Sequence, residues 1–330
     1  MKKILALTCL VLLMTSSLAA AAEVELRISK QYGISHFLLN VMEEHKLIEK
    51  HMEAAKIKNV QVKWLTLGSG SASNDAFLSG NVDVISLGVG PFLRLWDKTK
   101  GKVKGIAAID QAPLKLNMSR PEVKGLEDLK ETDRIAMPAV KVSISALLLQ
   151  MAVAKEFGIE NYQKYDHLTV SAKHPDAAIA LTSDKSEITG HFASEPFSTI
   201  ELKNPRIHTV INSYDTLGGN HIFNLVAASE DFYAKHPELV KIVMLAMDDA
   251  SKWITNNKRA MAELYVQVTK SKEPVDLIYE ILQDPQIIYD ITPVKIISFS
   301  DFLYETGVIK TKPTSWKELF LPPIHDRLGS

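Results

Sequence analysis

Cysteine is almost absent from this sequence, which has a single one, Cys9, in 330 residues. Cys9 lies in an apolar N-terminal stretch, and the sequence LTCL around it does not match a lipid-attachment site. If this stretch is removed, the remaining chain has no thiol. That absence excludes a cysteine nucleophile, a thiolate metal site and a disulfide bond.

Long apolar runs and clusters of one charge are also missing. Beyond residue 22, no stretch approaches the roughly 18 consecutive apolar residues that a membrane-spanning helix needs. The 38 Lys and Arg residues are interspersed with 39 Asp and Glu residues, which gives a formal net charge of −1. Without a basic cluster, we expect no nucleic-acid partner.

The usual catalytic motifs are absent as well. The sequence has neither the G-x-S-x-G motif of serine hydrolases nor the H-E-x-x-H motif of zinc proteases, and its glycine-rich loop lacks the Lys-Ser or Lys-Thr pair of a P-loop. The ten histidines are scattered without metal-ligand spacing, and we interpret His174, before a proline at a predicted helix start, as local geometry. We therefore expect no enzyme activity, no bound metal and no organic cofactor.

The first 22 residues have the order of a targeting segment. A basic start is followed by the apolar run Ile4–Met14 and by small residues, with Ala20 and Ala22 at the −3 and −1 positions of an A-x-A cleavage site. This order is typical of a secretory signal peptide, and the apolar run is too short to cross the ~30 Å hydrocarbon core of a membrane. We predict that residues 1–22 are removed by cleavage after Ala22.

Strands and helices alternate along the rest of the chain. Short apolar strands are followed by segments with helical spacing, and this plan repeats in the middle third of the sequence. From about residue 230 onward the pattern becomes helical. The pattern predicts an α/β protein with two units, each a sheet flanked by helices, followed by a helical tail.

One piece of sequence occurs in two similar copies, Asn74–Phe92 and Pro175–Phe197. Each copy opens with Asp-Ala on a helix, continues into an apolar strand and ends in a small-residue loop, SLGVGPF or GHFASEPF. Ligands of open α/β sheets bind beyond the carboxyl ends of the strands, so these twin loops would each supply half a pocket if the two units face each other. The alternative is that any two α/β units look alike.

Polar residues at predicted strand ends and helix starts are candidates for ligand binding. The loop GSGSAS, residues 68–73, opens one helix, and Ser143 and Ser145 open another. Free N–H groups and the positive end of a helix suit an anion, although the same serines can simply cap their helices. Glu195 could bind a ligand donor or cap the next helix, and Tyr32 could cover one face of a ligand.

Several motifs occur in an order that resembles a known family. They are ISKQYGIS after the first strand, ALLLQMA on the helix that Ser143 opens, HPDAAIAL, GHFASEPF, SYDTLGG and DFYAKHPELVKIVMLAMDDA. Together they resemble the bacterial extracytoplasmic substrate-binding proteins of ABC importers, in the group that includes nitrate, taurine, alkanesulfonate and thiamine-precursor binders. The resemblance covers essentially the whole chain beyond residue 22.

The resemblance implies a type II periplasmic-binding-protein fold, with two α/β lobes, each a mixed sheet flanked by helices, and two hinge strands. It places residues 23–112 and 217–330 in lobe 1 and residues 113–216 in lobe 2. It also implies a periplasmic receptor that captures a small-molecule ligand and delivers it to a membrane permease with its ATPase. Because one chain completes the pocket, we expect a monomer.

The family's contact loops map onto one set of residues in this sequence. They are Tyr32, Gly33, Ser69, Gly70, Ser71, Gly88, Val89, Gly90, Ser143, Ser145, Phe192, Ser194 and Glu195. These loops contain no arginine to clamp a sulfonate or nitrate, and Glu195 adds a carboxylate, so a plain inorganic anion is not expected. A ligand with a donor group, or a sulfonate-like or heterocyclic organic anion, fits better. A periplasmic enzyme or a ligand sensor on the same fold is the alternative.

Overall fold

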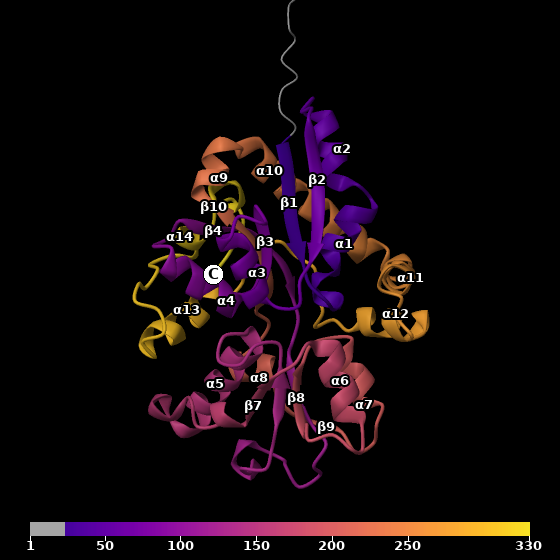
Figure 1. The fold of residues 1–330 in the computed structure, drawn as a ribbon, viewed down its shortest axis with the longest axis vertical. Helices are drawn as coiled ribbons and strands as arrows, with labels where there is room; N and C mark the ends of the chain where they lie inside the picture. Colours follow the sequence, from indigo (N-terminus) through magenta and orange to yellow (C-terminus); the bar gives the residue numbers. More distant parts are fainter. Residues whose placement is uncertain (1–23) are drawn as a thin grey trace, which may run out of the picture.

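The computed structural model describes residues 24–330. The predicted signal peptide, its cleavage after Ala22 and the lone Cys9 lie outside the described residues. Within the described part, no helix is both long enough and apolar enough to cross a membrane. The chain forms two α/β parts, one above the other in Figure 1, each with a five-stranded sheet.

The first sheet has the strand order β2-β1-β3-β10-β4. Its strands are β1 (Val24–Lys30), β2 (Val60–Thr66), β3 (Val84–Gly88), β4 (Val103–Gln111) and β10 (Ile222–Ser229). The strand β1 pairs in parallel with β2 and β3, whereas β10 is antiparallel to both of its neighbours. Every residue of β3 is buried, as expected for a central strand covered by helices on both faces.

The second sheet has the order β7-β6-β8-β5-β9. Its strands are β5 (Lys115–Met118), β6 (Ile135–Met137), β7 (Thr169–Ser171), β8 (Gly190–Ala193) and β9 (His208–Asn212). Here β6 is parallel to β7 and β8, and β5 is antiparallel to β8 and β9. Both sheets are therefore mixed, as the resemblance implied for the fold class.

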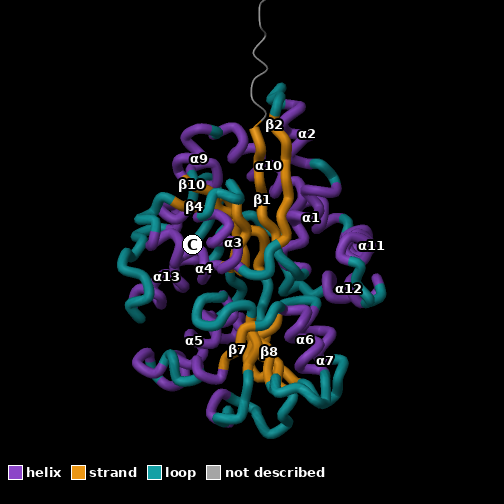
Figure 2. The backbone as a smooth tube through the Cα atoms, in the orientation of Figure 1, coloured by secondary structure: helices purple, strands orange, loops and turns teal. Residues whose placement is uncertain are grey.

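Helices flank both sheets, as Figure 2 shows. The helices between β1 and β4 in the sequence are α1 (Phe37–Glu44), α2 (Leu47–Ala54), α3 (Gly70–Leu78) and α4 (Val89–Lys98). The second sheet has α5 (Ile144–Phe157), α6 (His174–Thr182), α7 (Phe197–Leu202) and α8 (Ser213–Leu217). The helical tail has α9 (Glu230–Lys235), α10 (Pro237–Asn256), α11 (Lys258–Thr269), α12 (Val275–Gln283), α13 (Ile296–Glu305) and α14 (Trp316–Leu319).

The chain crosses from one sheet to the other twice. It leaves the first sheet after β4 and enters the second at β5, and it returns through α8 to β10. We call the parts built on the first and second sheets the first lobe and the second lobe. The lobe boundaries at residues 112 and 217 that the resemblance implied remain a prediction.

The C-terminal segment closes the first lobe. Phe320 is buried against β4, where the N–H of Leu321 donates to the carbonyl oxygen of Gly105 at 2.8 Å. A Cβ atom added to Gly105 would lie 2.3 Å from the ring of Phe320, so the strand needs glycine here to let the ring approach. The tail thus returns to the first lobe, which it stabilises by burying apolar surface.

Candidate ligand-binding site

Two adjoining cavities lie between the lobes. The outer cavity, about 490 Å³, is lined by Lys30, Gln31, Tyr32, Gly33, Phe37, Asn40, Thr66, Pro175, Phe197, Tyr265, Val268, Thr269 and Ser271. The inner cavity, about 40 Å³, is lined by Gln31, Tyr32, His36, Gly68, Gly70, Gly88, Pro91, Pro138, Ser143, Ile144, Ser145, His174, Ser194, Phe223 and Asn224. Gln31 and Tyr32 line both, so the loop after β1 borders the two cavities.

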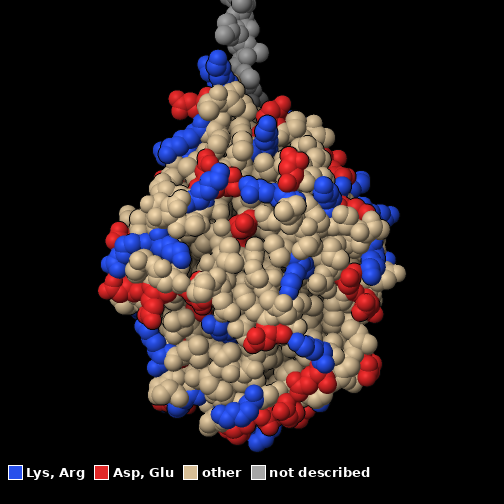
Figure 3. All heavy atoms as spheres, turned by 180° about the vertical axis from the view of Figure 1, so that it is seen from behind, with Lys and Arg blue, Asp and Glu red and all other residues tan. Residues whose placement is uncertain are grey.

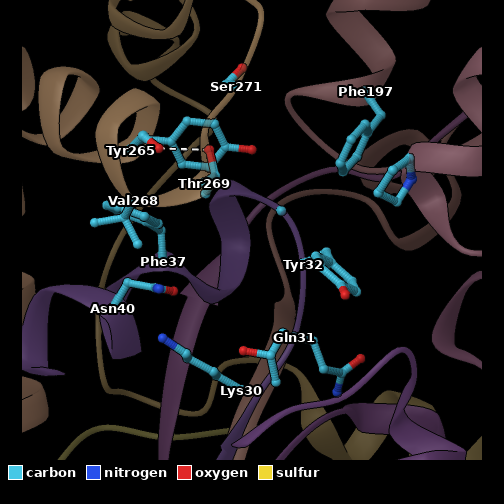
Figure 4. A pocket seen from close by; sticks show the side chains of 13 residues that line it. Lys30, Gln31, Tyr32, Phe37, Asn40, Phe197, Tyr265, Val268, Thr269 and Ser271 are labelled. Atoms are coloured by element: carbon cyan, nitrogen blue, oxygen red, sulfur yellow. Dashed lines mark hydrogen bonds between the residues drawn. The ribbon is translucent and has the colours of Figure 1, made fainter. Parts of the chain in front are cut away.

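Four aromatic side chains line the outer cavity. Figure 4 shows Tyr265 and Phe197 on opposite sides of it, one from α11 of the first lobe and the other from α7 of the second. Phe37 packs edge-on against Tyr265 with ring centroids 5.0 Å apart. Tyr32 is 45% exposed and lies between these walls. Such walls suit the apolar body of an organic ligand.

The outer cavity has one cationic lining residue, Lys30, and its charge is already paired. The ammonium group of Lys30 donates to the carboxylate of Glu43 on α1. Its neighbour Asn40 is buried and offers an uncharged amide. This cavity is therefore apolar with a few neutral polar groups rather than a site for a strong charge.

Three helices begin at the inner cavity. The N-cap residues of α3 and α5 are Ser69 and Ser143, whose hydroxyl oxygens accept the N–H groups of Ala72 and Ala146, both at 3.2 Å. Helix α4 begins after Gly88, which itself lines the cavity. The first N–H groups of a helix lack acceptors within the helix and carry partial positive charge, so their convergence favours an anion or another acceptor group.

Within residues 24–330, the polar side chains around the inner cavity include no Lys, Arg, Asp or Glu. The Nε2 group of Gln31 donates to the carbonyl oxygen of Ser86 at 2.8 Å, and the hydroxyl of Ser145 donates to the carbonyl oxygen of Phe192 at 3.2 Å. His36 is 5% exposed, and its Nδ1 has no partner among the described residues. Burial lowers the pKa of His36 to about 3, so this imidazole is neutral at pH 7.

The lobes touch each other directly around the inner cavity. The N–H of Ile34 donates to the carbonyl oxygen of Glu195 at 3.2 Å. At a second place, the Nη2 group of Arg94 on α4 donates to the carbonyl oxygen of Lys141 at 2.8 Å. These contacts describe a closed arrangement, in which a ligand would be enclosed.

The twin loops contribute to the same cavity, but each packs against a different segment of the opposite lobe. Gly88 and Ser194 both line the inner cavity. Gly88 lies against Ile144 at the start of α5, whereas a Cβ atom on Gly33 would lie 3.4 Å from the carbonyl oxygen of Glu195. Each loop therefore meets a helix start or strand end of the other lobe.

The structure brings part of the predicted contact set to the cavity walls. The residues that line one or both cavities are Tyr32, Gly33, Gly70, Gly88, Ser143, Ser145 and Ser194. Those that line neither cavity are Ser69, Ser71, Val89, Gly90, Phe192 and Glu195. Ser71 lies instead at a surface hollow beside Arg94, and Phe192 has no exposed surface. A role in ligand binding remains a prediction for both groups.

Glu195 has protein partners for its carboxylate. Its Oε2 accepts the N–H of Thr199 on α7 at 3.1 Å, and its Oε1 lies 3.5 Å from the ammonium group of Lys115. The side chain is 4% exposed. The helix-capping alternative for Glu195 is thus realised in this arrangement.

Several lining residues were not singled out from the sequence. They are Gln31, His36, Phe37, Asn40, Phe197, Asn224, Tyr265, Thr269 and Ser271. His174, which we interpreted as local geometry, also lines the inner cavity. Gln31 and His36 lie close in sequence to the predicted contact residues Tyr32 and Gly33, and this closeness could have identified them as lining residues. Tyr265 and its neighbours lie on the helical tail, where no local pattern marks a cavity wall.

Charge on the outer surface is mixed. On the face shown in Figure 3, Lys and Arg are interspersed with Asp and Glu. Within the part of the chain that the structure describes, no group of three or more His, Cys, Asp or Glu residues is arranged to hold a metal ion.

Comparisons with known proteins place this geometry in context. A family model described as the NMT1-like family matches residues 34–268. A search of curated protein sequences found no match. Among solved structures, the alkanesulfonate-binding protein SsuA from Xanthomonas axonopodis pv. citri bound to MOPS is 18% identical, with a TM-score of 0.71, over 91% of this chain and 99% of its own.

Two further solved structures have the same fold. The periplasmic aliphatic sulphonate binding protein SsuA from Escherichia coli is 16% identical, with a TM-score of 0.68, over 92% of this chain and 99% of its own. The ligand-binding component of an ABC-type import system from Staphylococcus aureus, with zinc bound, is 14% identical, with a TM-score of 0.65, over 92% of this chain and 98% of its own. At these identities the likeness establishes the periplasmic-binding-protein fold.

Proposed function

This chain belongs to the NMT1-like family, and from this premise we propose that it is the substrate-binding receptor of an ABC importer. The receptor captures a small organic ligand reversibly between its lobes and delivers it to a membrane permease with its ATPase. The predicted signal peptide supports a periplasmic location. The observation that carries the proposal is the pair of adjoining cavities between two directly touching lobes.

The proposed ligand is an organic anion with a compact head group. The inner cavity of about 40 Å³ has room for a group of a few atoms, since a water molecule needs roughly 10–15 Å³ of such volume. Helix starts at Gly70, Gly88 and Ser143 supply N–H donors to that head group. The outer cavity of about 490 Å³ takes the apolar body between Phe197 and Tyr265. MOPS, bound by the Xanthomonas relative, also joins a sulfonate to an organic body.

We extend the proposal to the oligomeric state, the lobe bounds and the cofactors. The receptor works as a monomer with lobe 1 at residues 23–112 and 217–330, lobe 2 at residues 113–216, and neither metal nor organic cofactor. Capture needs a dissociation constant near 1 μM, about −8 kcal/mol, which is affinity without chemical change. A ligand recovered chemically altered would instead identify an enzyme on the same fold.

A thermal-shift screen followed by calorimetry tests the proposal. Benzenesulfonate and benzamidine carry the same aromatic body with an anionic acceptor head or a cationic donor head. We expect benzenesulfonate to stabilise the native state, by about 2.7 kcal/mol at a hundredfold excess over its dissociation constant, and benzamidine to have no effect. Stabilisation by benzamidine alone would contradict the anionic assignment.

A matched variant separates the two cavities. Tyr265→Ala should weaken benzenesulfonate by about tenfold, because one aromatic wall of the outer cavity is lost, while methanesulfonate, which has almost no body, should change by less than about twofold. Equal losses for both probes would contradict the division into a head site and a body site.

A further inference from the structure

A chain of hydrogen-bonded side chains runs from the interior of the second lobe to the inner cavity. Glu201 on α7 and His191 on β8 are both fully buried and are hydrogen-bonded through Oε1 and Nδ1. The other ring nitrogen of His191, Nε2, lies 2.8 Å from Nδ1 of His174 at the start of α6. Because His174 lines the inner cavity, the chain ends at the ligand site. We call Glu201, His191 and His174 the relay.

Neighbouring side chains hold the relay in place. The second carboxylate oxygen of Glu201 accepts a hydrogen bond of 2.8 Å from Nδ2 of the fully buried Asn117. The ring of His174 stacks on Phe197, with centroids 6.0 Å apart and planes 12° apart. Since Nδ1 of His174 is engaged by His191, Nε2 is the ring nitrogen available to the cavity.

The protonation state of the relay decides whether Nε2 of His174 is a hydrogen-bond donor or an acceptor toward the inner cavity. When Glu201 is protonated, its hydroxyl donates to Nδ1 of His191, Nε2–H of His191 donates to Nδ1 of His174, and Nε2–H of His174 donates into the cavity. When that proton leaves to solvent, each hydrogen bond reverses direction, and Nε2 of His174 becomes an acceptor. A proton on His191 instead of Glu201 produces the same outward donor.

Resting on the receptor function above, we propose that this relay sets which head groups the inner cavity accepts. The protonated relay adds a side-chain donor to the N–H groups of the helix starts and so favours an anionic, acceptor-only head group. The deprotonated relay replaces that donor with a lone pair and disfavours it. Binding of the head group is thereby coupled to one proton, with Glu201 and His191 as positioning residues that do not touch the ligand.

Burial supports a relay that is protonated at neutral pH. Burial raises the pKa of Glu201 to about 8, although the hydrogen bond from Asn117 acts in the opposite direction. Burial lowers the pKa of His191 to about 3 and lowers that of His174 as well, so neither imidazole takes up a second proton. The outward donor is thus retained until the pH passes about 8.

The surrounding charges do not compete with this proton. The other titratable groups on the elements around the relay are His36, Lys115, Lys173, Asp176, Glu195, Lys203 and His208. Lys115 pairs with Glu195 at 3.5 Å and Lys203 with Glu273 at 3.2 Å, while Lys173 and Asp176 are exposed. His36, on the opposite wall of the cavity, is neutral, and its unpartnered Nδ1 is a second group left for a ligand.

Nitrogen-15 NMR of the histidine-labelled protein without ligand reads the relay directly, because long-range spectra distinguish the two neutral tautomers. We expect His174 to carry its proton on Nε2 at about pH 7 and to switch to Nδ1 with a midpoint near pH 8. His208 is an internal control for the assignment of tautomers, because its Nε2 lies 2.7 Å from the carbonyl oxygen of Val123, to which only an N–H can donate. An Nδ1–H tautomer of His174 at about pH 7, or no switch by about pH 9.5, would overturn the proposal.

The variant Glu201→Gln sharpens the test. Its amide oxygen can still accept from Asn117, which directs the NH₂ group at Nδ1 of His191 and mimics the protonated carboxyl. We expect His174 to remain Nε2–H throughout the titration. A switch that persists in a folded Glu201→Gln protein would contradict the relay, and the titration of the unaltered protein decides the matter if this variant does not fold.

Binding of benzenesulfonate links the relay to the site. The dissociation constant should rise by about tenfold between pH 7 and pH 9 in the unaltered protein and stay flat in Glu201→Gln. A rise of the same size in both proteins would overturn the coupling. Failure of benzenesulfonate to bind at pH 7 would overturn the anionic head group instead, while the tautomers of His174 judge the relay separately.

Discussion

Gly88 of the first lobe lies directly against Ile144 of the second. A Cβ atom added to Gly88 would come within 2.9 Å of Cγ2 and 3.1 Å of Cβ of Ile144. Both residues line the inner cavity, and each stands at the start of a helix. Because Ile144 is branched at Cβ, its contact atoms are stiff and cannot turn aside. The lobes can therefore close to this distance only if residue 88 has no side chain.

The variant Gly88→Ala should weaken ligand binding by opposing closure. The overlap with Ile144 costs about 1–2 kcal/mol in the closed form, so we expect the dissociation constant of benzenesulfonate to rise by about tenfold. The unfolding of the ligand-free protein should change little, because Gly88 has φ −69°, which alanine adopts freely.

The double variant Gly88→Ala with Ile144→Ala provides the control. Removing Cγ2 of Ile144 relieves the closest contact, so the double variant should bind more tightly than Gly88→Ala alone. Calorimetry on the single and double variants gives the interaction free energy between the two positions. Additive effects would show that Gly88 acts by another route.

Much of the fold could be predicted from periodicity. The strand β1 follows from the alternation of apolar and polar residues in VELRISK, whereas β3 and β10 follow from short apolar runs. The helix α10 follows from Pro237 at its first position and apolar residues at helical spacing. The segment LKLNM, residues 114–118, was harder to assign, since its sequence looks like a continuation of the preceding strand β4. It forms β5 of the second sheet, because the chain crosses between the sheets after β4 ends at Gln111, and strand pairing over such separations leaves no local trace.

The variant Glu195→Gln decides between two roles for this carboxylate. Thr199 N–H and Lys115 already satisfy it, so we expect a loss of about 1 kcal/mol in the free energy of unfolding and a change of less than about twofold in benzenesulfonate affinity. Urea denaturation and calorimetry measure the two quantities. A loss of about 1–3 kcal/mol in affinity would restore the hypothesis of direct ligand contact.

Docking of the C-terminal segment depends on Gly105. Alanine there would place Cβ 2.3 Å from the ring of the buried Phe320, so we expect Gly105→Ala to destabilise the protein by about 1–3 kcal/mol in urea denaturation. Gly125→Ala is the matched control, because its nearest atoms belong to the flexible end of Glu127. Similar losses for both variants would point to backbone effects rather than to the ring contact.

The candidate site was only half visible in the sequence. Helix starts such as Ser143 and glycine loops such as Gly88 can be predicted from the sequence, because a local pattern marks them. The relay cannot be predicted in this way, since Glu201, His191 and His174 come from three elements and meet only when β8, α6 and α7 pack together. The position of Tyr265 in the cavity wall could not be predicted either, because the sequence of a helix does not indicate which surface its apolar face will contact.

Stability should be greatest near pH 6.5, because buried acids and buried bases titrate in opposite directions. Burial raises the pKa values of Asp110 and Glu201 to about 8, so their contribution is complete below the pKa of an unfolded carboxyl, about 4, and is lost as the pH rises to about 8. Burial lowers the pKa values of His36 and His191 to about 3 and of His221 to about 4. Their contribution is complete above about 6.5 and is lost as the pH falls.

The loss of stability above pH 6.5 can be assigned to individual carboxyl groups by substitution. Between pH 6.5 and 8 the free energy of unfolding should fall by up to about 1.4 kcal/mol per pH unit for each of the two carboxyls. Asp110→Asn should remove roughly half of that slope, since an amide cannot ionise and its oxygen can still accept from Asn224. The exposed Glu305→Gln should leave the slope unchanged. Urea denaturation at half-unit intervals from pH 4.5 to 9 measures the profile, and a stability that keeps rising from pH 6.5 to 8 would show that these carboxyls are ionised in the folded protein.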